Sequence, residues 1–185
     1  LMTLFLLTRT RPFQRLFQKR DHTPAELVLV ASIFCLFAVF STYTGIPVEG
    51  ALINVRIIAI ISGGILFGPW VGIPAGVISG LHRYLIDMDG HTSIPCLIAS
   101  IIAGLLATWL HLRCRKSRLW LYGILAGMAC EGLTMLLIWL LTEPHAVGVE
   151  IVSHIAYPMI AGTLCIGLII KLVQDLDDEK ELIAA

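Results

Sequence analysis

The feature that most constrains this chain is a succession of long apolar stretches separated by short breaks. A helix needs roughly 20 predominantly apolar residues to cross the ~30 Å hydrocarbon core of a bilayer. Six apolar stretches of about this length or somewhat shorter cover residues 27–44, 53–67, 70–86, 94–112, 119–141 and 151–173. The breaks between them contain Gly, Pro or charged residues, which end helices. The sequence therefore predicts an all-α integral membrane fold, a six-helix polytopic bundle with glycine-rich packing.

Composition supports this fold class and excludes several functions. Of 185 residues, 57% are hydrophobic and 14% are charged, whereas soluble domains carry about 25% charged residues. Strand-like alternation is absent, which argues against a barrel. The formal net charge is zero and no basic cluster is interleaved with aromatics, so no nucleic-acid partner is expected. The five cysteines form no CxxC motif, so neither a metal site nor a cofactor is predicted.

The distribution of Lys and Arg predicts the orientation of the bundle. Residues 9–20 hold five of these basic residues and residues 113–118 hold four, while the loops at 45–52, 87–93 and 142–150 hold none. Basic loops remain on the cytoplasmic side, so six crossings place the C-terminal end there too. The apolar residues 1–7 are too short to span and are interpreted as the end of an N-terminal helix. Two parts are predicted: a transmembrane domain over 1–173 and the start of a signalling helix over 174–185, the alternative for the latter being a solvated chain end.

Two arginines interrupt the apolar stretches and are the main candidates for function. Arg56 and Arg83 are expected at equal depth on antiparallel helices joined at Gly68-Pro69, facing one another near the outer surface. A charge within a span costs roughly 3 kcal/mol or more and marks a functional site by default. Arginine matches a carboxylate with two parallel donors, so the pair suits a small carboxylate ligand. Two alternatives remain open: both side chains extend to the headgroups, or Arg83 pairs locally with Asp87.

Other polar residues and a glycine series fall inside the apolar stretches. Glu131 is interpreted either as a counter-charge to an arginine or as a neutral acid hydrogen-bonded between helices. Ser153 and His154 are candidates to line the same cavity. Glycines at a strict spacing of four residues, from Gly68 to Gly80, predict close helix packing.

These motifs together resemble a known receptor domain. They are Asn54-Val-Arg56, Gly63-Gly64, Phe67-Gly68-Pro69, Gly72, Gly76, Gly80, His82-Arg83-Tyr84 and Pro95-Cys96. The chain is similar over nearly its whole length to the membrane domain of LytS-type sensor histidine kinases, the five-transmembrane LytS/YhcK class. Within that class it resembles the pyruvate-sensing YpdA/BtsS-like kinases.

The resemblance implies a homodimeric, multi-pass protein of the bacterial inner membrane. Its parent would continue into a GAF-like domain and a protein-histidine kinase domain that acts on a cytoplasmic response regulator. The present fragment would itself not be an enzyme. The implied ligand, a small external carboxylate such as pyruvate, would contact Arg56, Arg83, Cys96, Ser100 and Asn54. Supporting positions would be Glu131, His82, Ser93 and Ser153.

One position departs from the family pattern. The BtsS branch has a serine three positions after its cysteine, whereas Ala99 occupies that position here and Ser100 follows it. Two rival functions remain open beside the sensor. A small-molecule transporter, or its substrate-capture subunit, would also suit short glycine-rich helices around a pocket. A structural assembly module would need no ligand at all.

Overall fold

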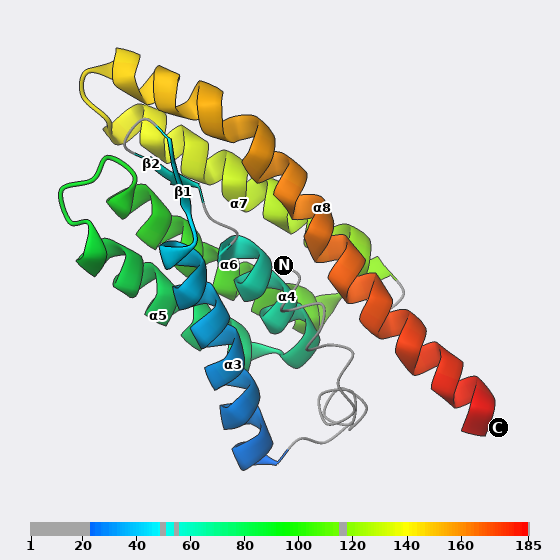
Figure 1. Ribbon diagram of the computed structural model, residues 1–185. Helices are drawn as coiled ribbons and strands as arrows, with labels where there is room; N and C mark the ends of the chain where they lie inside the picture. Colours follow the sequence, from blue (N-terminus) through cyan, green and yellow to red (C-terminus); the bar gives the residue numbers. More distant parts are fainter. Residues whose placement is uncertain (1–22, 49–50, 54–55, 115–117, 185) are drawn as a thin grey trace.

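Six helices and one small hairpin make up the part of the chain that the computed structural model describes, residues 23–48, 51–53, 56–114 and 118–184 (Figure 1). The elements are α3 (Pro24–Tyr43), β1 (Ile46–Val48), β2 (Ala51–Ile53), α4 (Arg56–Phe67), α5 (Pro69–Ile86), α6 (Ser93–Arg113), α7 (Leu119–Leu141) and α8 (His145–Ala184). The predicted N-terminal helix end at residues 1–7 lies outside the described residues.

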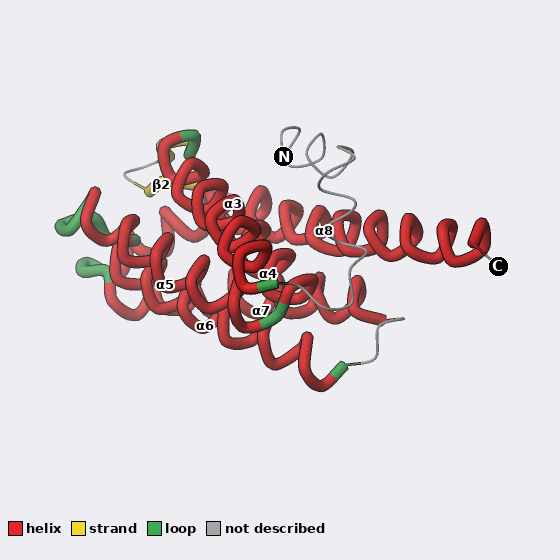
Figure 2. Tube along the Cα trace, turned by 90° about the horizontal axis from the view of Figure 1, so that it is seen from below, coloured by secondary structure: helices red, strands yellow, loops and turns green. Residues whose placement is uncertain are grey.

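Four of these helices are long and apolar enough to cross a membrane. They are α3, α6, α7 and α8, the last over His145–Asp175. Large apolar side chains such as Phe40, Leu105 and Leu164 are exposed on their outer faces, as a surface in contact with lipid requires. The helices pack as one bundle, seen along a second direction in Figure 2. The predicted all-α integral membrane fold is confirmed.

Helix α4 is shorter still than the predicted second apolar stretch, 53–67. α4 has 12 residues, and at 1.5 Å per residue it is about 18 Å long, too short to cross the ~30 Å core alone. Every residue of α4 except Leu66 is buried, so α4 forms the centre of the bundle. α5 has 18 residues but, with its glycines and Arg83, is less apolar than the four spanning helices.

A β-hairpin stands where only a loop was expected. β1 and β2 pair antiparallel, with Ile46 opposite Ile53 and Val48 opposite Ala51. β2 therefore includes the first residue of the predicted second apolar helix, which begins only at Arg56. Both strands contact α8. The hairpin therefore lies beside α8, directly before α4 in the chain.

The helix ends fall into two groups at opposite ends of the bundle. The α5–α6 turn, the α7–α8 connection and the hairpin lie toward one end (Figure 1). The junction of α4 with α5, the start of α3 and the C-terminal end of α6 lie toward the other. α8 has 40 residues and is thus about 60 Å long, so it extends beyond this second end. The predicted helical continuation past Gln174 is confirmed as far as Ala184.

Glycines let α4, α5 and α6 approach at backbone distance. A Cβ added at Gly76 would lie 2.5 Å from the Ser100 carbonyl oxygen and 3.3 Å from the Gly104 Cα. One added at Gly72 would lie 2.8 Å from the Gly64 Cα. Gly68 has φ 78° at the start of α5, a conformation that disfavours any other residue. The predicted role of the glycine series in close packing is thus confirmed.

Replacing Gly76 with Ala should destabilise the bundle because the new methyl group meets backbone that cannot move aside. We expect the free energy of unfolding to fall by roughly 1–3 kcal/mol, the usual cost of overpacking, measured by thermal denaturation in detergent. Gly132→Ala is the matched control, since a Cβ there meets nothing within 4 Å. Equal melting temperatures for the two variants would contradict this packing.

Candidate functional site

Arg56, the first residue of α4, lies inside the bundle and is hydrogen-bonded to α6. Its side chain is 2% exposed, and its Nε donates to the Ser100 Oγ over 3.0 Å. The Ser100 hydroxyl in turn donates to the Cys96 carbonyl oxygen over 2.6 Å. Because the Ser100 hydroxyl proton points to that carbonyl, the Oγ of Ser100 is free to accept a hydrogen bond from the Arg56 guanidinium. The hydroxyl therefore holds Arg56 at a fixed place on α6.

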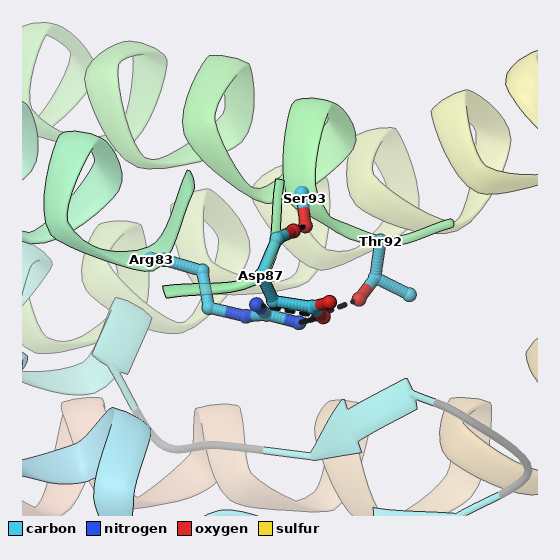
Figure 3. Close-up of polar contacts among 4 residues, drawn as sticks. All are labelled: Arg83, Asp87, Thr92 and Ser93. Carbon is cyan, nitrogen blue, oxygen red and sulfur yellow. Dashed lines mark hydrogen bonds and ion pairs between the residues drawn. The ribbon is translucent and has the colours of Figure 1, made fainter. Parts of the chain in front are cut away.

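Arg83 occupies the last turn of α5 and is fully buried. Its Nη1 and Nη2 both donate to the Asp87 Oδ2 over 3.1 Å, and Nη2 also donates to the Thr92 Oγ1 over 2.9 Å (Figure 3). The local ion pair that the sequence left open is therefore present. Among the described residues, the Arg83 Nε has no hydrogen-bond partner.

The turn between α5 and α6 is held by contacts of its own. Ser93 is fully buried and its hydroxyl donates to the Asp87 backbone carbonyl oxygen. The Gly90 N–H donates to the same carbonyl over 3.2 Å. A Cβ at Gly90 would collide with the Asp87 carboxylate, so the absence of a side chain there leaves room for the acid. Ser93 thus belongs to the Arg83 cluster, as a support of the turn.

The two arginines line one face of α6 at different levels. Their hydroxyl partners, Thr92 and Ser100, are eight residues apart, or roughly 12 Å along a helix axis. The prediction of equal depth is therefore wrong, because the short α4 begins further inside the bundle than a full span would. The burial of both side chains also argues against the alternative in which they extend to the headgroups.

Glu131 on α7 faces the same interior as Arg56. Its side chain is 3% exposed, α4 packs against α7, and the Arg56 charge is near enough to attract the carboxyl group. Among the described residues, one carboxyl oxygen, Oε2, lacks a hydrogen-bond partner. Both interpretations of Glu131, a counter-charge to Arg56 and a neutral acid between helices, therefore remain compatible with its position.

Some of the remaining predicted site residues lie close to the two arginines and others do not. Cys96 is buried on α6, and its carbonyl belongs to the Arg56 chain of hydrogen bonds. His82 is partly buried, with its Nε2 3.2 Å from the Tyr43 hydroxyl. Ser153 and His154 are exposed and bond to the Glu150 carbonyl of their own helix, so their proposed place in the cavity is wrong. Asn54 lies outside the described residues.

The two residues that accept hydrogen bonds from Arg83, Asp87 and Thr92, were not among the predicted site residues. Asp87 could be predicted as a partner of Arg83 because it follows Arg83 by four residues, a spacing that brings side chains together on a helix. Thr92 gave a weaker signal: it stands at the N-cap of α6, where threonine is common, but it makes no side-chain cap bond. Its hydroxyl instead accepts from Arg83.

Ser100→Ala tests the Arg56 anchor. Loss of a buried hydrogen bond to a charged donor should lower the free energy of unfolding by about 1.5–3 kcal/mol, measured by thermal denaturation. Ser153→Ala is the matched control, because that hydroxyl is exposed and bonds only within its own helix region. A Ser100→Ala protein as stable as wild type would contradict the anchoring role.

Comparison with known proteins identifies the family of this arrangement. The family model described as 5TMR of 5TMR-LYT matches residues 10–176. Sensor histidine kinase YpdA of Escherichia coli (strain K12) is 56% identical over 185 residues, which is 100% of this chain and 33% of that protein. Sensor protein LytS of Bacillus subtilis (strain 168) is 33% identical over 176 residues, 84% of this chain and 29% of that protein.

A third relative extends the comparison. Sensor histidine kinase BtsS of Escherichia coli (strain K12) is 31% identical over 182 residues, 95% of this chain and 32% of that protein. The chain therefore spans about a third of the length of these relatives. No solved structure shows significant similarity to it. The matched range includes every spanning helix and both buried arginines, and the chain belongs to the 5TMR-LYT family, as a transmembrane sensor domain of the LytS type.

Proposed function

We propose that this domain detects a small external carboxylate, with pyruvate as the first candidate, and signals to a histidine kinase through α8. The observation that carries the proposal is the pair of buried arginines, one on α4 and one on α5, each hydrogen-bonded to a hydroxyl group of α6 or its N-cap. Arginine keeps its charge in any protein environment and presents donors that match a carboxylate. Small hydroxyls beside such donors suit the keto or hydroxyl oxygen of a short acid.

The route from the arginines to α8 is short. Arg56 is the first residue of α4, and α4 contacts both α7 and α8. A ligand that binds Arg56 competes with Glu131 for its charge, so binding changes the attraction between α4 and α7. A ligand shifts the signalling state only by binding one arrangement more tightly than the other. The α4 contacts with α7 and α8 are where that difference would arise.

The complete protein is proposed as a homodimer in the bacterial inner membrane. α8 would leave the membrane on the cytoplasmic side and continue toward a GAF-like domain and the kinase, which acts on a response regulator. Support comes from the relatives, two of which are sensor histidine kinases. The helix beyond the bundle provides the physical link, because it continues without a break to Ala184.

Arg83→Ala should weaken pyruvate binding at least tenfold, since it removes charge-assisted hydrogen bonds worth about 1.5–3 kcal/mol. Arg56→Ala should also weaken it, through the loss of a second positive charge in the same interior. The measurement is isothermal titration calorimetry on purified protein in detergent. Arg113→Ala, an exposed arginine at the other end of α6, should bind as wild type does. Absence of binding by folded wild-type protein would refute the proposal, and uptake of labelled pyruvate into proteoliposomes would favour a transporter instead.

The orientation can be tested with a membrane-impermeant thiol reagent on intact cells. We expect Asp89→Cys, in the exposed α5–α6 turn, to be labelled in a Cys114→Ser background. Wild-type Cys114, at the end of α6, should be labelled only after the cells are opened. The reverse pattern would place the C-terminal end of α8 outside.

A further inference from the structure

We infer that Asp87 is a built-in competitor for the ligand carboxylate at Arg83, so that an incoming acid binds by displacing it. This inference rests on the proposed function, because it concerns the same arginine. It adds a residue that sets the affinity of the site without forming part of the bound state. The ion pair shown in Figure 3 is then the ligand-free arrangement.

The position of the Asp87 carboxylate is the first support. A single oxygen, Oδ2, accepts from both terminal nitrogens of Arg83 at 3.1 Å. A ligand carboxylate would bring a second negative charge to the same guanidinium and compete for its Nη2. Two carboxylates cannot occupy this position together, since they would repel one another and share the same donors. Ligand binding at Arg83 therefore requires Asp87 to leave.

The quality of the existing pair is the second support. The strongest arginine–carboxylate pairs use two parallel N–H···O bonds to two oxygens. Asp87 accepts through one oxygen only. The buried Nε of Arg83 has no hydrogen-bond partner among the described residues and remains available as a donor. A free carboxylate is not tied to the backbone four residues away and can engage Nε together with Nη2. It can thus make the better pair and replace Asp87.

Asp87 is also the partner that is able to move. Its side chain is 36% exposed, whereas that of Arg83 is 0% exposed, so the acid can rotate toward water while the arginine stays in place. It stands at the C-cap of α5, where the helix dipole disfavours negative charge. The backbone carbonyl of Asp87 is held separately by Ser93 and Gly90. The turn therefore keeps its supports when the side chain departs.

As a consequence, a higher ligand concentration is needed to occupy the site. In the absence of ligand, Asp87 neutralises Arg83 and avoids an uncompensated buried charge. Binding then costs the loss of this pair, so the affinity is lower than the arginine alone would give. Replacing the carboxylate of Asp87 with an uncharged group of the same shape should remove that cost.

Asp87→Asn is the decisive variant and Asp89→Asn its matched control. Both remove one negative charge from the same turn, but Asp89 is exposed and has no recorded contact with Arg83. We expect Asp87→Asn to lower the Kd for pyruvate about three- to tenfold, as the loss of a half-exposed competing ion pair predicts. Asp89→Asn should leave the Kd unchanged. Calorimetry with pyruvate, and with its neutral amide as a non-binding comparison, provides the measurement.

Each outcome decides between distinct conclusions. An unchanged or higher Kd in Asp87→Asn, with wild type binding normally, overturns the competitor role and leaves the proposed function intact. An equal gain in Asp89→Asn also overturns it, because the effect would then be general electrostatics. Absence of pyruvate binding by folded wild type refutes the proposed function, and the competitor role with it. Should Asp87→Asn melt below the assay temperature, Asp87→Ser is measured in its place, with the same gain expected.

Discussion

The cost of placing two guanidinium groups inside a membrane bundle governs the rest of this structure. A buried charge without partners is far too costly to persist, so each arginine needs acceptors within reach. The hydroxyl of Ser100 and the cluster of Asp87 and Thr92 supply them. All three lie on α6 or in the turn before it, so α6 must pack close to both arginine-bearing helices. The glycines of α5 and α6 make that approach sterically possible.

The fold class and most helix boundaries follow from hydropathy alone, because long apolar runs have few alternatives in a bilayer. α7 agrees with its predicted range of 119–141, α5 starts one residue earlier than predicted, and α6 is one residue longer at each end. The hairpin and the short α4 were missed. Residues 46–53 are apolar enough to belong to a span, but strands β1 and β2 pair with one another and contact α8, about 100 residues later in the chain. Local patterns carry no information on such a contact.

The candidate site was predictable to a similar degree. Arg56, Arg83 and Glu131 stand out because charge is rare in apolar stretches, and the structure buries all three. Their relative depth was not accessible, since it depends on where α4 begins. Ser153 was placed wrongly because residue number along α8 gives its level but not its face. Thr92 was overlooked because a threonine before a helix is ordinarily explained by capping alone.

The hairpin beside α8 has backbone groups that need hydrogen-bond partners outside the hairpin itself. Strands that replace part of a spanning helix bring backbone N–H and C=O groups to a depth where lipid cannot satisfy them, and a two-stranded ribbon pairs only its inner edge. Irregular backbone at such depth survives where protein or water accepts its hydrogen bonds. The outer edges of β1 and β2 therefore need hydrogen-bond partners from neighbouring protein or from water, a demand that a full-length α4 would not have made.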